Sequence, residues 1–286
     1  YNTHVFITAA GIAVRAIAGH IRDKRSDPAV LVLDQIGEFV ISLLSGHLGR
    51  ANEMACCIAE LTGGQAVITT ATDTMGLPSL DVLAQRQGLA ISDMKALREV
   101  SAALLRGEEV QLYDPQKSLK LSAAEKKCFQ IVEESCWWSK DKAGVWVDWR
   151  NTVLSGNQLQ LYPPCLAAGI GCNRGTSCAE ILELVQKTFS RQGLALKSLA
   201  QIGSIEQKSD EQGLLQAARE LGAELVFYPA AELKGIETPS PSNVVHRHMG
   251  VYSVCEAAAC KLAGTDHLLI GKVKSVNATL AVALGA

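Results

Sequence analysis

The sequence lacks several features that would assign it at once to a familiar class. Its 286 residues contain no signal peptide and no apolar run near the roughly 20 residues that a membrane-spanning helix needs. A formal charge of −2 and a pI of about 6.3 give no excess of positive charge for nucleic acid or an anionic membrane surface. The nine cysteines are an odd number without a Cys-x-x-Cys pair, which argues against a disulfide framework or a zinc ribbon. We therefore expect a cytoplasmic protein with reduced thiols, no membrane attachment and no nucleic-acid partner.

The sequence contains enough apolar residues to form more than one hydrophobic core. Hydrophobic residues make up 48% of the 30.5 kDa chain, whose length is nearer two domains than one. Strand-like and helix-like segments alternate over residues 1–84 and again over 161–286, whereas 85–160 reads as mostly helical. We predict an α/β protein: two α/β domains with mainly parallel sheets, 1–84 and 161–286, joined by a small, mostly helical middle segment at 85–160.

A glycine-bounded turn, Gly-His-Leu-Gly at 46–49, precedes a predicted helix at 48–61. Such an entry often exposes backbone N–H groups to an anionic ligand, although ordinary loops are built in the same way. His47 is the best-placed general base, because its reference pKa of about 6.5 lets it take or give a proton at neutral pH. Asp73, after the predicted strand AVITT, is the second candidate. The alternative is that His47 is a structural or solvated loop histidine.

The stretch GIGCNRGTS, residues 169–177, lies between a predicted strand and a predicted helix, where α/β folds bind phosphates and carboxylates. Its glycines fall as G-x-G-x-x-x-G, which is not the dinucleotide fingerprint, and no Gly-Lys-Ser/Thr follows as in a P-loop. Arg174 in this turn can hold a carboxylate in a bidentate fork. A tight turn with a solvated arginine explains the same residues equally well.

Other charged residues lie near the ends of predicted elements. Lys272 and Lys274 alternate along a predicted strand, so they point to one side and offer two ammonium groups to an anionic substrate, unless they are solvated surface lysines. Lys208 and Glu211 precede a helix whose N-terminal dipole favours acidic residues. His246 and His248 have no third ligand nearby in the sequence, so no protein-bound metal is expected.

Several unrelated motifs, in order across essentially the whole chain, resemble one family. They are FVISLLSGHLGRANEMACCIAELTGGQAVITTATD, GIGCNRGTSCAEI, QKSDEQGLL, TPSPSNVV and IGKVKSVNATLAVA. The sequence is similar to the cobalt-precorrin-5A hydrolases of anaerobic cobalamin biosynthesis, the cobalamin biosynthesis protein CbiG family. The resemblance implies a hydrolase that opens the δ-lactone of cobalt-precorrin-5A, releases acetaldehyde and yields cobalt-precorrin-5B. It implies no cofactor, because the cobalt is part of the tetrapyrrole substrate.

The resemblance also implies where the substrate binds. A precorrin carries many acetate and propionate groups, so a mildly acidic enzyme needs local cations and N–H donors. The expected catalytic residues are His47, Asp73 and Lys272, with His47 as the base that activates water. The expected substrate-binding residues are Arg15, Gly46, Gly49, Asn52, Thr70, Gly169, Gly171, Arg174, Gly175, Thr176, Lys208, Glu211, Lys274 and Ser275.

Two other functions stay open at this point. A non-catalytic tetrapyrrole carrier would use the same cationic loops without releasing acetaldehyde. A nucleotide-binding enzyme with a variant glycine-rich loop would bind nucleotide tightly, although both standard fingerprints fail. Family members carry a strand–helix region ahead of the position of Tyr1, so we expect the N-terminal domain to be truncated at its start. Neighbouring pathway enzymes and a second copy of the chain are the protein partners that the resemblance allows.

Overall fold

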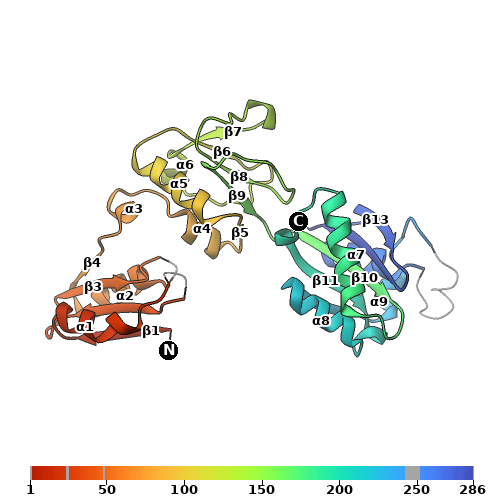
Figure 1. The fold of residues 1–286 in the computed structure, drawn as a ribbon, viewed down its shortest axis with the longest axis horizontal. Coiled ribbons are helices and arrows are strands. Elements are labelled where there is room, and N and C mark those ends of the chain that lie inside the picture. Colours follow the sequence, from red (N-terminus) through yellow and green to blue (C-terminus); the bar gives the residue numbers. More distant parts are fainter. Residues whose placement is uncertain (1, 24–25, 48, 242–251, 286) are drawn as a thin grey trace. The chain divides into compact units, whose positions relative to one another are not determined.

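The computed structural model describes residues 2–23, 26–47, 49–241 and 252–285. The chain forms two compact units (Figure 1). Unit 1 comprises Tyr1–Val147 and Leu154–Leu161, and unit 2 comprises Asp148–Val153 and Tyr162–Ala286. Leu48, the end of the TPSPSNVV motif from residue 242, and the two histidines His246 and His248 lie outside the described residues.

The N-terminal part of unit 1 is a four-stranded sheet with helices. Its elements are β1 (Thr3–Ile7), α1 (Ala10–Ile17), the 3₁₀ helix η1 (Ala18–His20), β2 (Ala29–Leu33), β3 (Phe39–Leu44), α2 (Ala51–Thr62), β4 (Gln65–Val67) and α3 (Ala71–Thr74). The order is β1-β2-β3-β4; the outer pairs are parallel and β2–β3 is antiparallel. Alanines at every fourth position of α2, from Ala51 to Ala59, let the helix lie close against Leu31 of β2.

The rest of unit 1 contains a second sheet, five strands in the order β5-β9-β8-β6-β7. Its elements are α4 (Leu80–Arg86), β5 (Ala90–Ile91), α5 (Met94–Leu105), β6 (Val110–Tyr113), α6 (Ala123–Lys126), β7 (Phe129–Val132), the 3₁₀ helix η2 (Ser135–Trp137), β8 (Gly144–Val147) and β9 (Gln158–Tyr162). The pairs β6–β7, β6–β8 and β8–β9 are parallel. Leu97 and Val100 of α5 share a core with Val145 and Leu159 of the sheet.

This middle sheet corrects the prediction of a mostly helical segment. The strands have between two and five residues, and buried glutamines interrupt their apolar pattern. Gln111 and Gln158 are 1% and 3% exposed, and both side-chain amides donate to the backbone carbonyl of Ser139. Because this loop accepts hydrogen bonds from their amides, the two glutamines can be buried in strands, although glutamine in a sequence usually indicates an exposed position. The predicted α/β class itself is confirmed.

Unit 2 is a five-stranded sheet in the order β12-β11-β10-β14-β13. Its elements are β10 (Leu166–Cys172), α7 (Cys178–Arg191), β11 (Leu199–Ile205), α8 (Gln212–Leu221), β12 (Glu224–Tyr228), α9 (Ala230–Lys234), α11 (Val254–Ala263), β13 (Leu268–Lys274) and β14 (Ala278–Leu284), with 3₁₀ helices η3 (Leu196–Ser198) and η4 (Glu206–Lys208). The pairs β10–β11 and β11–β12 are parallel, whereas β14 runs antiparallel to both its neighbours. Within the described ranges of the whole chain, no helix has the length and apolar character needed to cross a membrane.

Candidate functional site

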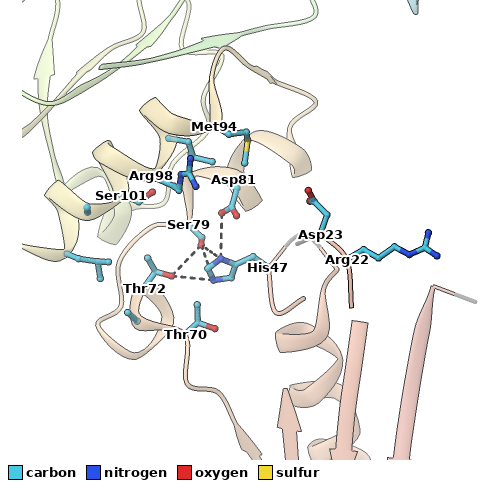
Figure 2. A pocket seen from close by; sticks show the side chains of 14 residues that line it. Arg22, Asp23, His47, Thr70, Thr72, Ser79, Asp81, Met94, Arg98 and Ser101 are labelled. Atoms are coloured by element: carbon cyan, nitrogen blue, oxygen red, sulfur yellow. Dashed lines mark hydrogen bonds and ion pairs between the residues drawn. The ribbon is translucent and has the colours of Figure 1, made fainter. Parts of the chain in front are cut away.

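A cavity of about 690 Å³ opens around His47 in unit 1 (Figure 2). Its walls come from five places: the loop after α1, the turn before α2, the start of α3, the start of α4, and one side of α5. We call it the His47 cavity. It is lined by Arg22, Asp23, His47, Thr70, Ala71, Thr72, Ser79, Asp81, Met94, Leu97, Arg98, Ser101, Ala102 and Leu105.

The turn that carries His47 is tightly packed. Ser45 and Arg50 on either side of it have left-handed backbones, with φ of 57° and 65°, and the N–H of Asn52 donates to the carbonyl of Gly46. A Cβ on Gly46 would lie 2.6 Å from Oδ1 of Asn52, and one on Gly49 would lie 2.7 Å from the carbonyl oxygen of Ser45. Close packing therefore accounts for both glycines. The helix begins at Ala51, three residues later than predicted, because Arg50 leaves the helical conformation.

Oxygen atoms surround the imidazole of His47, whose side chain is 9% exposed. Its Nε2 lies 2.8 Å from Oδ2 of Asp73, and its Nδ1 lies 3.7 Å from Oδ1 of Asp81. The hydroxyl of Ser79 is 3.0 Å from Nδ1 and 3.1 Å from Nε2, and the hydroxyl of Thr72 is 3.3 Å from Nε2. Figure 2 shows Ser79, Asp81 and Thr72 converging on the ring. The imidazole is thus held in one place with an oxygen within reach of each nitrogen.

The charges beside the ring favour its protonated form. Contact with the Asp81 carboxylate is the largest influence and raises the pKa of His47 above its ordinary value. Burial acts in the opposite direction, because it penalises the charged imidazolium, and the hydrogen bond to Asp73 raises the pKa further. The net effect is a raised pKa.

Three predicted binding or catalytic residues form the support of His47. The side-chain amide of Asn52, a residue only 7% exposed, donates to Oδ2 of Asp73 at 3.0 Å and to the hydroxyl of Thr70 at 3.1 Å. Asp73 is 40% exposed at its side chain, so these bonds hold a carboxylate that solvent can reach. The structure therefore brings His47, Asn52, Thr70 and Asp73 together, as residues of one sequence segment.

Sequence reasoning missed Ser79 and Asp81. Ser79 precedes α4, where a serine usually caps the helix with its hydroxyl, but here the hydroxyl makes no cap hydrogen bond and lies beside His47. Asp81 falls in the first turn of α4, where an acid looks like an ordinary partner of the helix dipole. It is instead only 8% exposed. Nothing in the local pattern separates these two residues from ordinary helix-start residues.

The predicted residues of unit 2 around Arg174 also come together. Arg174 Nη1 lies 2.5 Å from Oδ1 of Asp210, its Nη2 donates to the carbonyl of Gln207, and its Nε lies 3.2 Å from Oε1 of Glu211. Glu211 in turn accepts from the N–H of Gly175 at 3.0 Å and lies 3.7 Å from Nζ of Lys208. Lys208 and Glu211 are about 95% buried at their side chains, whereas Arg174 is 62% exposed. Arg174 is therefore the cation of this cluster that a ligand can reach.

Thr176 stabilises the same turn, because its hydroxyl donates to the carbonyl of Asn173 at 2.8 Å. Gly175 has a φ of +75° with open space around it, so the turn needs its left-handed backbone. A cavity of about 490 Å³ lies beside this cluster and the starts of α7 and α8.

Lys272 and Lys274 do not present a matched pair of ammonium groups. The side chain of Lys272 is 7% exposed and lies 4.0 Å from Oε2 of Glu256, a fully buried carboxylate; its Nζ also donates to the carbonyl of Ser240. Lys274 is exposed. The register of β13 on β14 shifts between Ile270 and Val273, which interrupts the regular alternation on which the prediction relied.

The remaining predicted residues make packing contacts or hydrogen bonds with other parts of the protein. A Cβ on Gly169 would lie 1.8 Å from the carbonyl oxygen of Cys255, so this glycine lets α11 lie close against β10, and a Cβ on Gly171 would lie 2.8 Å from Oγ1 of Thr279. Ser275 donates to Glu180 at 2.6 Å. Arg15 is exposed and donates to the carbonyl of Gly11. In the part of the chain that the structure describes, no group of three His, Cys, Asp or Glu residues could hold a metal ion.

Comparisons with known proteins cover nearly all of the chain. Family models described as Cobalamin synthesis G N-terminal, Cobalamin biosynthesis central region and Cobalamin synthesis G C-terminus match residues 1–73, 78–163 and 166–283. The chain is 36% identical over 297 residues to a protein named Cobalt-precorrin-5A hydrolase from Priestia megaterium, covering 99% of this chain and 79% of the relative. It is 35% identical over 291 residues to a protein of the same name from Salmonella typhimurium, covering 99% and 82%.

A solved structure, that of CobE, a protein from the cobalamin biosynthetic pathway, is 38% identical over 42% of this chain and 93% of its own, with a TM-score of 0.40.

Proposed function

Because the chain belongs to the cobalt-precorrin-5A hydrolase family, and is thereby a hydrolase of cobalamin biosynthesis, we propose that the His47 cavity is its active site. There it opens the δ-lactone of cobalt-precorrin-5A, releases acetaldehyde and yields cobalt-precorrin-5B. The observation that carries the proposal is the buried imidazole of His47, which contacts Asp73 at 2.8 Å and faces a cavity of about 690 Å³. A nearly buried histidine beside a carboxylate is a typical acid–base group of an enzyme.

Lactone opening requires one proton transfer at the ring oxygen. The oxygen of water bonds to the lactone carbonyl carbon, the carbon–oxygen bond of the ring breaks, and the departing oxygen takes up a proton. His47 is the group of the cavity suited to that transfer, and Asp73 orients it through Nε2. The new hydroxyl then loses its proton to the solvent and its oxygen becomes the carbonyl oxygen of acetaldehyde as the carbon–carbon bond breaks, and the conjugated macrocycle takes the electron pair of that bond.

Substrate binding requires cations for the acetate and propionate groups. Arg22 and Arg98 line the His47 cavity from the loop after α1 and from α5. In unit 2, Arg174 and Lys274 are exposed cations and are the proposed contacts for further carboxylates. Lys272 remains a proposed catalytic residue, although its buried contact with Glu256 supports a structural role as well.

The proposal includes no resident cofactor, because the cobalt enters and leaves with the tetrapyrrole. The nine cysteines are all free thiols, which fits the cytoplasm as the compartment we propose. A second copy of the chain and neighbouring pathway enzymes are proposed partners.

Acetaldehyde release is the test of this function. The purified protein is given enzymatically prepared cobalt-precorrin-5A, and acetaldehyde is measured with a coupled alcohol dehydrogenase while the tetrapyrrole product is followed by mass spectrometry. We expect one acetaldehyde for each cobalt-precorrin-5B. Tight binding of the tetrapyrrole without acetaldehyde would instead establish a carrier, and absence of both binding and acetaldehyde would refute the proposal.

A further inference from the structure

The His47 imidazole has a carboxylate near each of its two nitrogens. Asp73 Oδ2 lies 2.8 Å from Nε2, and Asp81 Oδ1 lies 3.7 Å from Nδ1. A neutral imidazole has only one N–H, and its other nitrogen is an acceptor, which gains nothing from facing an acceptor-only carboxylate. The protonated ring has two N–H donors and matches both sides. Resting on the function proposed above, we infer that His47 works as the proton donor of the reaction and that Asp81 is a positioning residue that keeps it protonated.

The hydroxyl groups around the ring are compatible with this arrangement. Ser79 Oγ is almost equally far from the two nitrogens, at 3.0 and 3.1 Å. An oxygen so placed cannot lie in the ring plane along the direction of either nitrogen's N–H or lone pair. Ser79 therefore lacks the directed hydrogen bond to a base that a serine nucleophile needs.

Burial distinguishes the two carboxylates. The Asp81 side chain is 11% exposed and that of Asp73 is 40% exposed. Water screens Asp73 more strongly, so the attraction between Asp81 and the imidazolium is felt more fully despite the longer distance. The charge of Asp81 accordingly raises the pKa of His47 more than the charge of Asp73 does, and the direct contact with Asp81 is the largest influence of all. Asp81 also lines the His47 cavity, on the side where the substrate is proposed to bind.

Other charged groups face the same region from each surrounding element. Glu53 of α2 forms ion pairs with Arg50, which precedes α2, and with Arg86 of α4, and these residues share a smaller cavity with His47. On the loop after α1 and on α5, Arg22, Asp23 and Arg98 line the His47 cavity. The arginines there are exposed, so solvent screens their repulsion of the imidazolium. The carboxylates in contact with the ring therefore set its charge.

A proton donor is needed in lactone opening at the step in which the carbon–oxygen bond of the ring breaks. Water adds to the carbonyl carbon and loses one proton to the solvent. As the ring carbon–oxygen bond breaks, its electron pair goes to the departing oxygen, which takes the proton of His47. The new carboxylic acid then ionises, and His47 takes up a proton from the solvent, so the net release is one proton for each lactone opened. This assignment departs from the expectation, drawn from the sequence, that His47 acts as the general base.

The sign of the pH dependence separates a donor from a base. If the imidazolium is the active form, kcat/KM is highest below the raised pKa of His47 and falls as the pH rises through it. Asp81→Asn removes the largest cause of the raised pKa. The falling limb should then move to lower pH, so that kcat/KM drops about tenfold on the alkaline side and much less on the acidic side.

The control neutralises a carboxylate away from the cavity. Glu60→Gln, on an exposed position of α2, should leave the limb where it is, and Asp81→Glu should restore part of the wild-type position. A rate that rises with pH through the titration of His47 would overturn the inference, and so would an unchanged limb in Asp81→Asn.

A second measurement does not depend on turnover. The ring carbon and proton signals of His47, assigned by comparison with His47→Gln, are titrated by NMR in the substrate-free protein. Their midpoint should lie above the ordinary value for histidine and should fall in Asp81→Asn. If acetaldehyde is never released, the proposed function fails, whereas the NMR titration still decides whether Asp81 holds the proton on His47. An equal midpoint in both proteins contradicts the inference directly.

Discussion

Asn52 and His47 share one carboxylate oxygen. The side-chain amide of Asn52 donates to Oδ2 of Asp73 at 3.0 Å, and Nε2 of His47 lies 2.8 Å from that same atom. Asn52 comes from the buried side of α2, so its amide is fixed by the packing of the helix on the sheet. The orientation of the imidazole therefore depends on a helix residue that lies one step away from it.

Asn52→Ala should lower kcat about tenfold while leaving a folded protein. Without the amide, the Asp73 side chain, which is 40% exposed, can turn into solvent and no longer orients His47. The loss of a hydrogen bond to a charged group should also lower the free energy of unfolding, by about 1.5–3 kcal/mol. Acetaldehyde release and thermal unfolding measure the two effects. Asn157→Ala, which removes an exposed amide bonded to the carbonyl of Asp141, is the control, and equal kcat in both variants would contradict this role of Asn52.

His47→Ala should reduce acetaldehyde release by roughly 10²- to 10⁴-fold, the usual contribution of an acid–base group. The matched control is His267→Ala, because the His267 side chain is 92% exposed in unit 2. We expect that control to retain wild-type turnover. Near-normal turnover by His47→Ala would rule out an acid–base role for this residue.

Lys272→Met should destabilise unit 2 by about 3–5 kcal/mol, because it leaves the fully buried Glu256 carboxylate without its cation. Lys274→Met removes an exposed lysine two residues away and should change the stability by less than about 0.5 kcal/mol. Chemical denaturation followed by circular dichroism compares the two. Equal stability, together with lost turnover in Lys272→Met alone, would favour the catalytic role over the structural one.

Gly169→Ala should destabilise unit 2 by more than about 2 kcal/mol. The new Cβ would lie 1.8 Å from the carbonyl oxygen of Cys255 and 2.6 Å from the N of Ala259, so α11 must move away from β10. Gly235→Ala is the control, because a Cβ there meets nothing within 4 Å and its φ of −83° suits alanine. A shift of the unfolding midpoint in the control as large as in Gly169→Ala would disprove the packing explanation.

Arg174→Ala should raise KM about tenfold with little change in kcat, if Arg174 binds a substrate carboxylate. Its ion pair with Asp210 is exposed, at 62% and 67% of the two side chains, so this pair adds little to the stability. The contact of Nε with the buried Glu211 carboxylate is the part of its loss that thermal unfolding should detect. Arg191→Ala, at the exposed end of α7, controls for removal of one positive charge. An unchanged KM in Arg174→Ala would exclude this contact.

The sequence by itself determined the α/β class and most of the strands and helices of residues 1–84 and of unit 2. Their apolar periodicity is local, and local periodicity decides which face of an element is buried. Local sequence order also predicts that four residues of the site lie near one another, namely His47, Asn52, Thr70 and Asp73. A turn, a helix, a strand and the start of α3 follow one another there within one short segment. The cluster around Arg174 and Glu211 follows from two loops that end neighbouring parallel strands.

Only the tertiary structure decided which partners these residues have. Asp81 approaches His47 because α4 begins beside the turn before α2, and for the same reason the hydroxyl of Ser79, the N-cap residue of α4, lies beside His47 and makes no cap hydrogen bond. Gln111 and Gln158 enter a buried sheet because a distant loop satisfies their amides. Lys272 meets Glu256 because α11 packs on the sheet that contains β13. Each of these outcomes depends on the free energy of a polar or charged group when buried, and that depends on residues that are remote in the sequence.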